Sequence, residues 1–233
     1  MIQNFNRVEK KYIIDKKTYK AFINELSQYM YIDKYSKTTI CNIYFDTDDY
    51  AIIRHSLDKP SYKEKLRVRS YGTPKIGEKV FVEIKKKFNG VVYKRRIRLP
   101  LDDFYHYFYN NKELTFKSNV DKQIFNEIDY FIKKYKVDKE TYISYVREAY
   151  IFDKDPNFRV TFDTAITYRT DDTKLESGSY GKRIMDDNYI MEVKTLGAMP
   201  LWFVRLLSKY EIYPNSFSKY GEVYKKMIND GEI

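Results

Sequence analysis

Charged and apolar residues alternate along several segments of this chain, with the charges at every second position. Residues i and i+2 of a β-strand point to the same face of a sheet, so such a segment has one charged face and one apolar face. The clearest apolar positions between the charges are Leu66 and Val68, Val82 and Ile84, and Ile97 and Leu99. The pattern predicts strands that turn their apolar faces to a core.

The charged faces of these segments are mostly positive. Their members are Arg7, Glu9 and Lys11; Lys63, Lys65, Arg67 and Arg69; Glu83, Lys85 and Lys87; Lys94, Arg96 and Arg98; Arg159 and Asp163; and Glu192 and Lys194. A polyanion that leaves water needs matched cations, because an unpaired charge in a low-dielectric site is costly. We therefore expect a curled sheet whose basic faces meet around an interior channel for a polyanion.

The same periodicity predicts the order of strands and helices. Strands are expected over residues 5–14, 38–46, 61–71, 78–88, 91–99, 141–152, 158–169 and 188–195. Helices are expected over 16–29, 102–109, 121–135, from Pro200 to Lys209 and from Ser218 to Ile228. Asp15 and Asp102 are the predicted N-caps of the first two helices, and Asn89-Gly90 predicts a hairpin turn. The polar residues 170–187 predict a mobile loop.

This order contains few strand–helix–strand alternations. It therefore predicts an α+β fold with a mainly antiparallel, closed β-barrel of about eight strands and helices packed outside. The sequence contains no linker, internal repeat or low-complexity segment, so residues 1–233 are expected to form a single domain.

The amino-acid composition narrows the kinds of molecule that this chain is expected to bind. The net charge is +10 and favours anionic partners, although Lys is abundant throughout, so the placement of the charges is more informative than their excess. A single cysteine, Cys41, is expected to be a packed residue in a protein of the reducing cytoplasm. With only two histidines, the sequence has no zinc signature. No stretch approaches the roughly 20 apolar residues of a transmembrane helix.

Motifs in a fixed order carry a family resemblance. They are Arg7-x-Glu9-x-Lys11, Tyr44-Phe45-Asp46, Lys65-x-Arg67-x-Arg69, Glu83-Ile84-Lys85, Lys94-Arg95-Arg96, Tyr145-x-Arg147, Arg159-x-Thr161-x-Asp163, Glu192-x-Lys194 and Ser216-x-Ser218-Lys219-Tyr220. In this order the chain resembles the VTC domain, the polyphosphate polymerase branch of the CYTH or triphosphate tunnel metalloenzyme superfamily. The wider superfamily begins with two glutamates and a lysine. Arg7 replaces the first glutamate here, which favours the polymerase branch over a two-metal hydrolase.

The resemblance implies a cytoplasmic enzyme that transfers the terminal phosphoryl group of ATP to a growing inorganic polyphosphate and releases ADP. Arginine grips phosphate with two donors and lysine acts as a point charge. The expected catalytic residues are Arg67, Arg69, Lys85, Arg147 and Lys219. The expected substrate-binding residues are Lys11, Lys65, Lys94, Arg96, Tyr145, Arg159, Lys194 and Ser218. Ser218 is alternatively only an N-cap.

A divalent cation, Mg²⁺ or Mn²⁺, is expected beside the phosphates, with Glu192 as the first choice of ligand and Glu9 as the second. Glu9 has an alternative role as the ion-pair partner of a neighbouring cation. Glu83 and Asp163 are expected to orient arginines and lysines rather than to bind metal.

Two other functions stay open: a metal-dependent triphosphatase, and a non-catalytic module that binds polyphosphate or nucleotide. The cations fall on strand faces and no nucleic-acid-binding motif is present, so no nucleic-acid partner is expected. The expected partners are ATP and inorganic polyphosphate. The sequence leaves open a membrane protein as a further partner, and also the oligomeric state.

Overall fold

The computed structural model describes residues 7–233, in which nine strands form one sheet. The hydrogen-bonded order is β1-β9-β7-β6-β2-β3-β4-β5, with β8 beside β7. The strands are β1 Arg7–Asp15, β2 Tyr31–Asp46, β3 Tyr62–Tyr71, β4 Lys79–Phe88, β5 Val91–Pro100, β6 Lys139–Ile151, β7 Arg159–Arg169, β8 Lys182–Arg183 and β9 Asn188–Leu196. The helices are α1 Lys16–Leu26, α2 Ala51–Leu57, α3 Leu101–Asn110, α4 Asn119–Tyr135, α5 Leu201–Lys209 and α6 Lys219–Asn229, with a short 3₁₀ helix at Leu175–Ser177.

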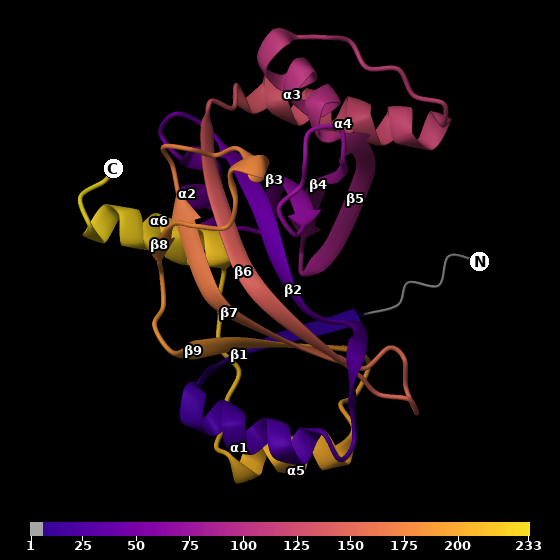
Figure 1. The fold of residues 1–233 in the computed structure, drawn as a ribbon, viewed down its shortest axis with the longest axis vertical. Helices are drawn as coiled ribbons and strands as arrows, with labels where there is room; N and C mark the ends of the chain where they lie inside the picture. The colour runs from indigo at the N-terminus through magenta and orange to yellow at the C-terminus, as the bar shows by residue number, and fades with distance from the viewer. Residues whose placement is uncertain (1–6) are drawn as a thin grey trace.

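All the strand pairings are antiparallel and the sheet is curved (Figure 1). The predicted α+β class and mainly antiparallel sheet are therefore confirmed. Hydrogen bonds do not close the sheet into the predicted barrel, because no strand pairing among the described residues joins β1 to β5. Instead, the segment before α6, which contains Asn215 and Ser218, links β1 to β3. The Asn215 amide donates to the Lys11 carbonyl oxygen at 2.7 Å, and the Lys65 ammonium donates to Ser218 Oγ at 3.3 Å.

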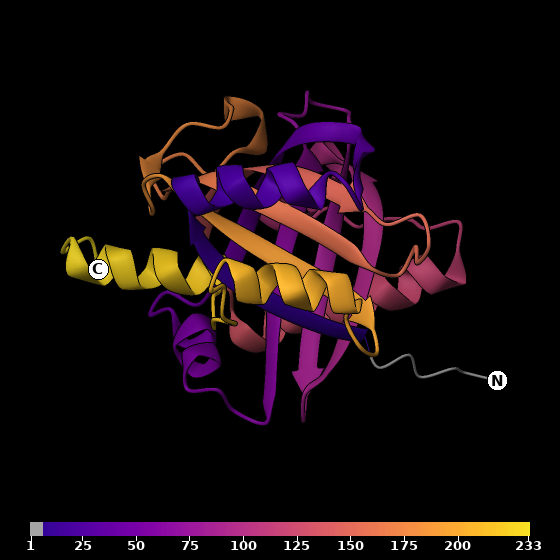
Figure 2. The same ribbon diagram turned by 90° about the horizontal axis from the view of Figure 1, so that it is seen from below.

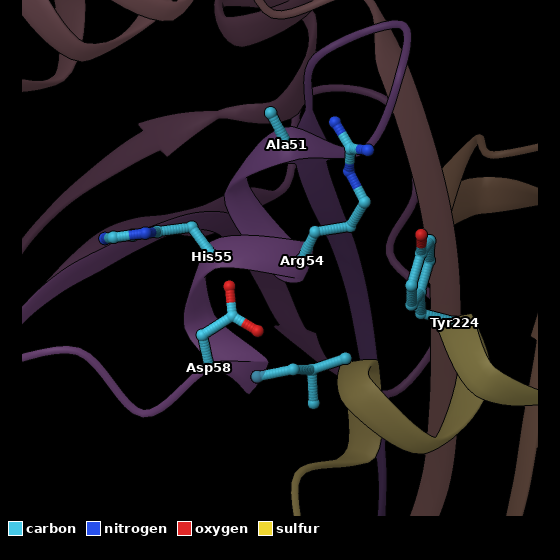
Figure 3. A pocket seen from close by; sticks show the side chains of 6 residues that line it. Ala51, Arg54, His55, Asp58 and Tyr224 are labelled. Carbon is cyan, nitrogen blue, oxygen red and sulfur yellow. The ribbon is translucent and has the colours of Figure 1, made fainter.

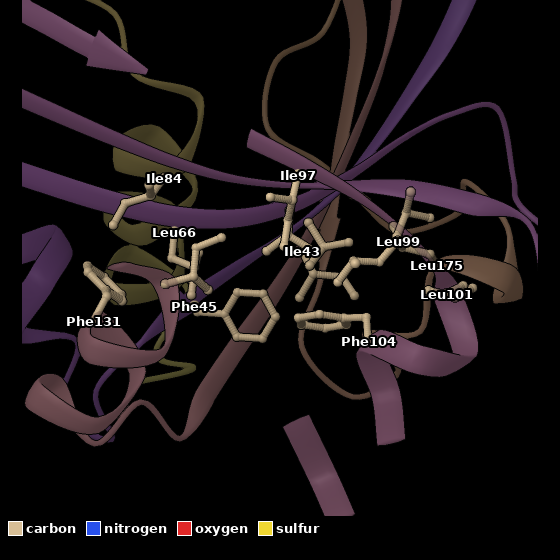
Figure 4. Close-up of a cluster of buried hydrophobic side chains, with 14 of the residues drawn as sticks. Ile43, Phe45, Leu66, Ile84, Ile97, Leu99, Leu101, Phe104, Phe131 and Leu175 are labelled. Carbon is tan, nitrogen blue, oxygen red and sulfur yellow. The ribbon is translucent and has the colours of Figure 1, made fainter. Parts of the chain in front are cut away.

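The apolar face of β3, β4 and β5 packs under α3 and α4 (Figure 4). The positions predicted from alternation, among them Leu66, Val82 and Ile97, are buried against Phe104 of α3 and Phe131 of α4. Burying this apolar surface stabilises the fold by roughly 25 cal/mol per Å². It also fixes which face of these strands is left for the charges.

Two further apolar clusters complete the core. Helices α1 and α5 lie side by side across β1, β9 and β7, where Phe22 and Phe203 are fully buried (Figure 2). Helix α6 packs Tyr220 and Val223 against Tyr44 and other residues of the central strands. Tyr44 alternates with Ile43 and Phe45, which face α3 and α4. Helix α6 therefore covers part of the opposite face of the sheet, the face that carries the charges.

Several predicted element boundaries were wrong. Helix α3 begins at Leu101 after Pro100, so Asp102 lies in its first turn and is not its cap. Helix α4 begins two residues earlier than predicted, after a Ser118 cap. Strand β2 begins at Tyr31, with an irregular register between Ile32 and Lys37. Residues 5 and 6 of the first predicted strand lie outside the described residues.

The predicted mobile loop over residues 170–187 contains the 3₁₀ helix and strand β8. The guanidinium group of Arg169 explains why this segment is structured. It donates to the carbonyl oxygens of Lys174, Gly178 and Tyr180 at 2.8–2.9 Å, and it lies 3.5 Å from the ring centroid of Tyr142. A buried cation that is satisfied by loop carbonyl groups fixes a segment whose composition alone is typical of a loop.

Helix α2 was missed because only seven residues form it and no side chain caps it from the usual position. Its N-terminus is instead held by Asp46, a fully buried residue at the end of β2. The Asp46 carboxylate accepts hydrogen bonds from the amides of Thr47, Ile52 and Ile53 at 2.8–3.0 Å, and from the Tyr220 hydroxyl at 2.9 Å. One carboxylate therefore joins β2, α2 and α6.

Among the described residues, no helix is both long and apolar enough to cross a membrane.

We predict that Asp46→Ala lowers the free energy of unfolding by about 3 kcal/mol, because buried amide groups lose their acceptor. Urea unfolding followed by circular dichroism measures this change. Asp58→Ala is the matched control, since Asp58 is exposed at the other end of α2 and its loss should cost less than about 0.5 kcal/mol. Equal stabilities of the two variants would contradict the role assigned to Asp46.

Candidate active site

Cross-strand pairing brings the predicted charges together on one face of the sheet. Directly opposed residues of antiparallel strands point to the same side. The register pairs Lys11 with Glu192, Glu192 with Thr161, Arg147 with Asp163, and Arg67 and Arg96 with Glu83. Strand β2 continues this face between the two groups, since Tyr44 and Asn42 oppose Arg67 and Arg69.

The first group, here called the Glu192 cluster, consists of Glu192 and Asp163 with Lys11, Arg147, Lys194 and Lys219. Arg147 donates two hydrogen bonds of 2.6 Å to Asp163 and a third of 3.1 Å to Glu192. Lys219, the first residue of α6, donates to Asp163 at 2.5 Å. The ammonium groups of Lys11, Lys194 and Lys219 lie 3.6–3.8 Å from Glu192.

Both carboxylates of the Glu192 cluster are buried and ionised. Burial raises the pKa of Glu192 and of Asp163, but the charges of Lys219 and Arg147 outweigh burial and lower both pKa values. The pKa of Lys219 is raised because the attraction of Asp163 and Glu192 exceeds the effect of its burial. The carboxylates therefore keep Lys219 and Arg147 charged and hold both side chains in fixed positions.

The second group, the Glu83 cluster, surrounds one carboxylate with three cations from β3 and β5. Glu83 is 1% exposed and accepts from Arg67 through Nε at 2.8 Å and Nη2 at 2.7 Å. Lys94 lies 2.6 Å and Arg96 3.9 Å from the other oxygen. Burial raises the pKa of Glu83, but Arg67, Arg69 and Lys94 outweigh burial and lower it to about 2. The side chains of Lys94 and Arg96 remain 40% and 51% exposed, so a ligand can reach them.

Arg69 and two tyrosines lie between the clusters. Arg69 is buried and donates to Asn42 Oδ1 at 2.9 Å and to the Tyr145 hydroxyl at 3.1 Å. Arg67 donates to the Tyr44 hydroxyl at 3.1 Å. Burial raises the pKa of Tyr44, but Arg67, Arg69 and Lys219 outweigh it and lower the pKa to about 8. The sequence pattern did not indicate Asn42, because a neutral residue carries no signal in an alternation of charges.

Three lysines lie abreast across β3, β4 and β5. The register opposes Lys65 to Lys85, and Lys85 to Lys94. Like charges directly opposite one another are destabilising. Burial lowers the pKa of Lys65 to about 8, and the charges of Lys63, Lys11 and Lys85 act in the same direction. Of these three lysines only Lys94 takes part in the ion pairs of the described residues. Lys65 and Lys85 therefore carry positive charge that no carboxylate of the described residues offsets.

Two predicted binding residues have other contacts. Arg159 donates to Asp33 at 2.9 Å and its side chain is 40% exposed, so it lies at the margin of the charged face beside Lys194. Ser218 is the N-cap of α6, because its Oγ accepts from the Gly221 amide at 3.2 Å. The same oxygen accepts from Lys65, so Ser218 positions that lysine as well.

A separate pocket lies outside the charged face, between α2 and α6 (Figure 3). Its lining residues are Ala51, Arg54, His55, Leu57, Asp58 and Tyr224, and none of them is a predicted site residue. Arg54 is paired with Asp49, and the side chains of Arg54 and His55 point in different directions. This pocket brings together no group of convergent reactive side chains.

A sequence model of the VTC domain matches residues 6–228 of the chain. The chain belongs to the VTC domain family. The resemblance carried by the ordered motifs is thereby confirmed over nearly the whole sequence. A comparison with curated proteins finds no match.

Solved structures with the same fold share little sequence with this VTC domain. A Bacillus halodurans protein provisionally described as an adenylate cyclase is 15% identical, with a TM-score of 0.56 over 91% of this chain and 93% of the other. A Hippeastrum protein was provisionally described as an adenylyl cyclase and then found to have a dominant triphosphatase activity. It is 14% identical, with a TM-score of 0.53 over 97% and 96% of the two chains. At these identities the comparisons establish the fold alone.

The VTC domain contains no preformed metal site of three or more acidic, histidine or cysteine side chains among its described residues. Glu9 lies 3.9 Å from both Lys11 and Lys194, the same lysines that contact Glu192. Mg²⁺ is often held by one or two carboxylates together with substrate phosphates. Glu192 and Glu9 therefore form no complete protein-only metal site among the described residues, and a cation held there would need further ligands from a bound phosphate.

We predict that Glu83 makes the stability of the fold sensitive to acid. Folding lowers its pKa from 4.5 to about 2, so ionised Glu83 stabilises the fold above about pH 4.5 and this contribution is lost as the pH falls toward 2. The contribution is on the order of 3 kcal/mol. Urea unfolding at pH 6 and pH 3 should show that Glu83→Gln is less stable at pH 6 and loses less stability on acidification.

The exposed Glu113 has no partner in the described structure and supplies the control, Glu113→Gln, whose pH dependence should match that of the unaltered chain. An unchanged pH dependence in the Glu83→Gln variant would show that Glu83 is not held ionised by its cations.

Proposed function

We propose that this VTC domain is a polyphosphate polymerase that transfers the terminal phosphoryl group of ATP to a growing inorganic polyphosphate, with residues 1–233 acting as one domain. The observation that carries the proposal is the excess of positive charge on one partly buried face. The cations of this face are Lys11, Lys65, Arg67, Arg69, Lys85, Lys94, Arg96, Arg147, Lys194 and Lys219, and the carboxylates are Glu9, Glu83, Asp163 and Glu192.

The excess suits a ligand with many negative charges in a row. Adjacent cations from β3, β4 and β5 would otherwise repel one another, and an extended chain of phosphates offsets this repulsion along the whole face. A ligand with a single phosphate would neutralise only one part of it. The extent of the charged face therefore supports a polymeric phosphate as well as a nucleoside triphosphate.

The two clusters suggest a division of roles. Phosphoryl transfer needs positioning and charge neutralisation more than covalent chemistry. Arg67 and Arg147 are each held by a carboxylate, so their charges are fixed before substrate arrives. We assign them, with Arg69, Lys85 and Lys219, to the transferring phosphoryl group. Lys11, Lys65, Lys94, Arg96, Tyr145, Arg159, Lys194 and Ser218 are assigned to the rest of the ATP and polyphosphate phosphates.

The acceptor is itself a phosphate oxygen, which is ionised near neutral pH, so the reaction needs no general base. When bound, Mg²⁺ or Mn²⁺ would neutralise charge on the phosphate oxygens, and Glu192 and Glu9 are the residues that would hold it. Lys11 and Lys194 contact both carboxylates and would orient them toward the cation.

A triphosphatase is the second candidate, and the activity of the structurally similar Hippeastrum protein favours it. Hydrolysis requires an activated water, and two-metal sites supply one. The four carboxylates of the charged face each lie beside at least two cations, which supports transfer to a phosphate acceptor over hydrolysis.

We predict that incubation with ATP and Mn²⁺ produces a ladder of polyphosphate on a polyacrylamide gel, with ADP in solution. Arg67→Lys keeps a positive charge beside Glu83 but loses the two-donor fork, so ladder formation should fall roughly 100-fold. Arg205→Lys is the control, because Arg205 is exposed on α5 and should not affect the reaction. Release of orthophosphate without a ladder would establish the triphosphatase, and the absence of both products would establish a binding module.

We also predict that tripolyphosphate stabilises the fold by relieving repulsion among the cations. At about one hundred times the Kd the added stability is about 2.7 kcal/mol. This corresponds to a rise of roughly 5–10 °C in the melting temperature of a chain of this size. Sodium sulfate at equal ionic strength is the control in a calorimetric scan. A rise no greater than that in sulfate would contradict an anion site on this face.

A further inference from the structure

We propose that Lys63 and Lys87 form an outer subsite that holds the polyphosphate chain beyond the row of Lys65, Lys85 and Lys94. The inference rests on the proposed function, and it makes chain length a determinant of affinity. Polymers that reach both lysines should bind more tightly than tripolyphosphate, which is held by the inner residues alone.

The position of the two lysines follows from the register of β3 and β4. Lys63 opposes Lys87, and the next pair on the same face is Lys65 with Lys85. Two residues along a strand span roughly 6.8 Å, so the outer pair lies one step beyond the inner row. On β5 the residue opposite Lys87 is Val92, where the row of charge ends. The lysines therefore continue the charged face toward the β4–β5 hairpin.

The outer pair has no negative partner in the described part of the chain. Neither Lys63 nor Lys87 takes part in an ion pair there, and the Lys63 ammonium donates to the carbonyl oxygen of Ser56 at 2.9 Å. Burial lowers the pKa of Lys63, and the positive charges of Lys87, Lys59 and Lys85 lower it further. Two opposed lysines without a carboxylate form an arrangement that an anion stabilises.

Lys86, on the opposite face of β4, differs from Lys63 and Lys87 because it has a carboxylate partner. Lys86 points toward α4 and pairs with Glu127 at 3.1 Å, and Arg95 of β5 pairs with the same carboxylate. The outward face of this hairpin therefore carries compensated charge. Lys63, Lys65, Lys85 and Lys87 form no ion pair among the described residues, and they lie on the inward face, which is the face already assigned to phosphate.

The test compares a long polyphosphate of about one hundred units with tripolyphosphate, by titration calorimetry at low salt. Lys63→Gln/Lys87→Gln should weaken binding of the long polymer about tenfold, which is about 1.4 kcal/mol, and should change tripolyphosphate binding less than twofold. The salt dependence of long-polymer binding should also become less steep, because fewer cations contact the chain. Lys86→Gln is the matched control and should change neither affinity. Melting temperatures confirm that each variant is folded.

A loss of affinity equal for both ligands would overturn the outer subsite and place the two lysines in the inner site. Unchanged affinity for the long polymer would also overturn it, while leaving the proposed function intact. If the unaltered chain binds neither ligand, both the subsite and the proposed function are wrong. The three failures give different pairs of affinities and can be told apart in one set of titrations.

Discussion

Asp163 is fully buried and accepts three charge-assisted hydrogen bonds, two from Arg147 and one from Lys219. An ionised carboxylate in such a place is tolerated only with partners of opposite charge, and removing one partner of a buried pair typically costs 3–5 kcal/mol. The pairing also joins the consecutive strands β6 and β7 to α6, whose Lys219 lies 56 residues beyond Asp163 in the chain. The arrangement of the charged face depends on it.

The charged face holds fewer carboxylates than cations. These few carboxylates explain how so many positive charges can lie close together. Glu192 lies among four cations, and Glu83 contacts three. Each carboxylate offsets repulsion locally while leaving the cluster positive. The cations are thereby preorganised for an anion, and the low dielectric of a partly buried site strengthens their interaction with it. This stabilisation is incomplete at Lys65 and Lys85, which form no ion pair among the described residues.

The helices matter to the site through the faces that they occupy. Helices α3 and α4 cover the apolar face of β3, β4 and β5, so the cations that alternate with the buried apolar residues, such as Arg67 and Lys85, point to the other side. Helix α6 occupies part of that other side and supplies Lys219 from its first turn. Asp46 fixes α6 through Tyr220, and Tyr220 stacks on Tyr44, whose hydroxyl contacts Arg67. Core packing and charge placement are therefore parts of one arrangement.

The sequence by itself determined eight of the nine strands and their two faces, because the two-residue period of a strand places Leu66 and Arg67 on opposite sides. It also determined the family, because the ordered motifs extend from Arg7 to Tyr220. Only the tertiary structure decided the partners. Arg69 with Asn42, Asp46 with α2, and Arg169 with the loop carbonyl groups join residues through register and loop geometry that no local pattern encodes. Closure of the sheet was likewise decided by long-range pairing, and β1 and β5 do not pair.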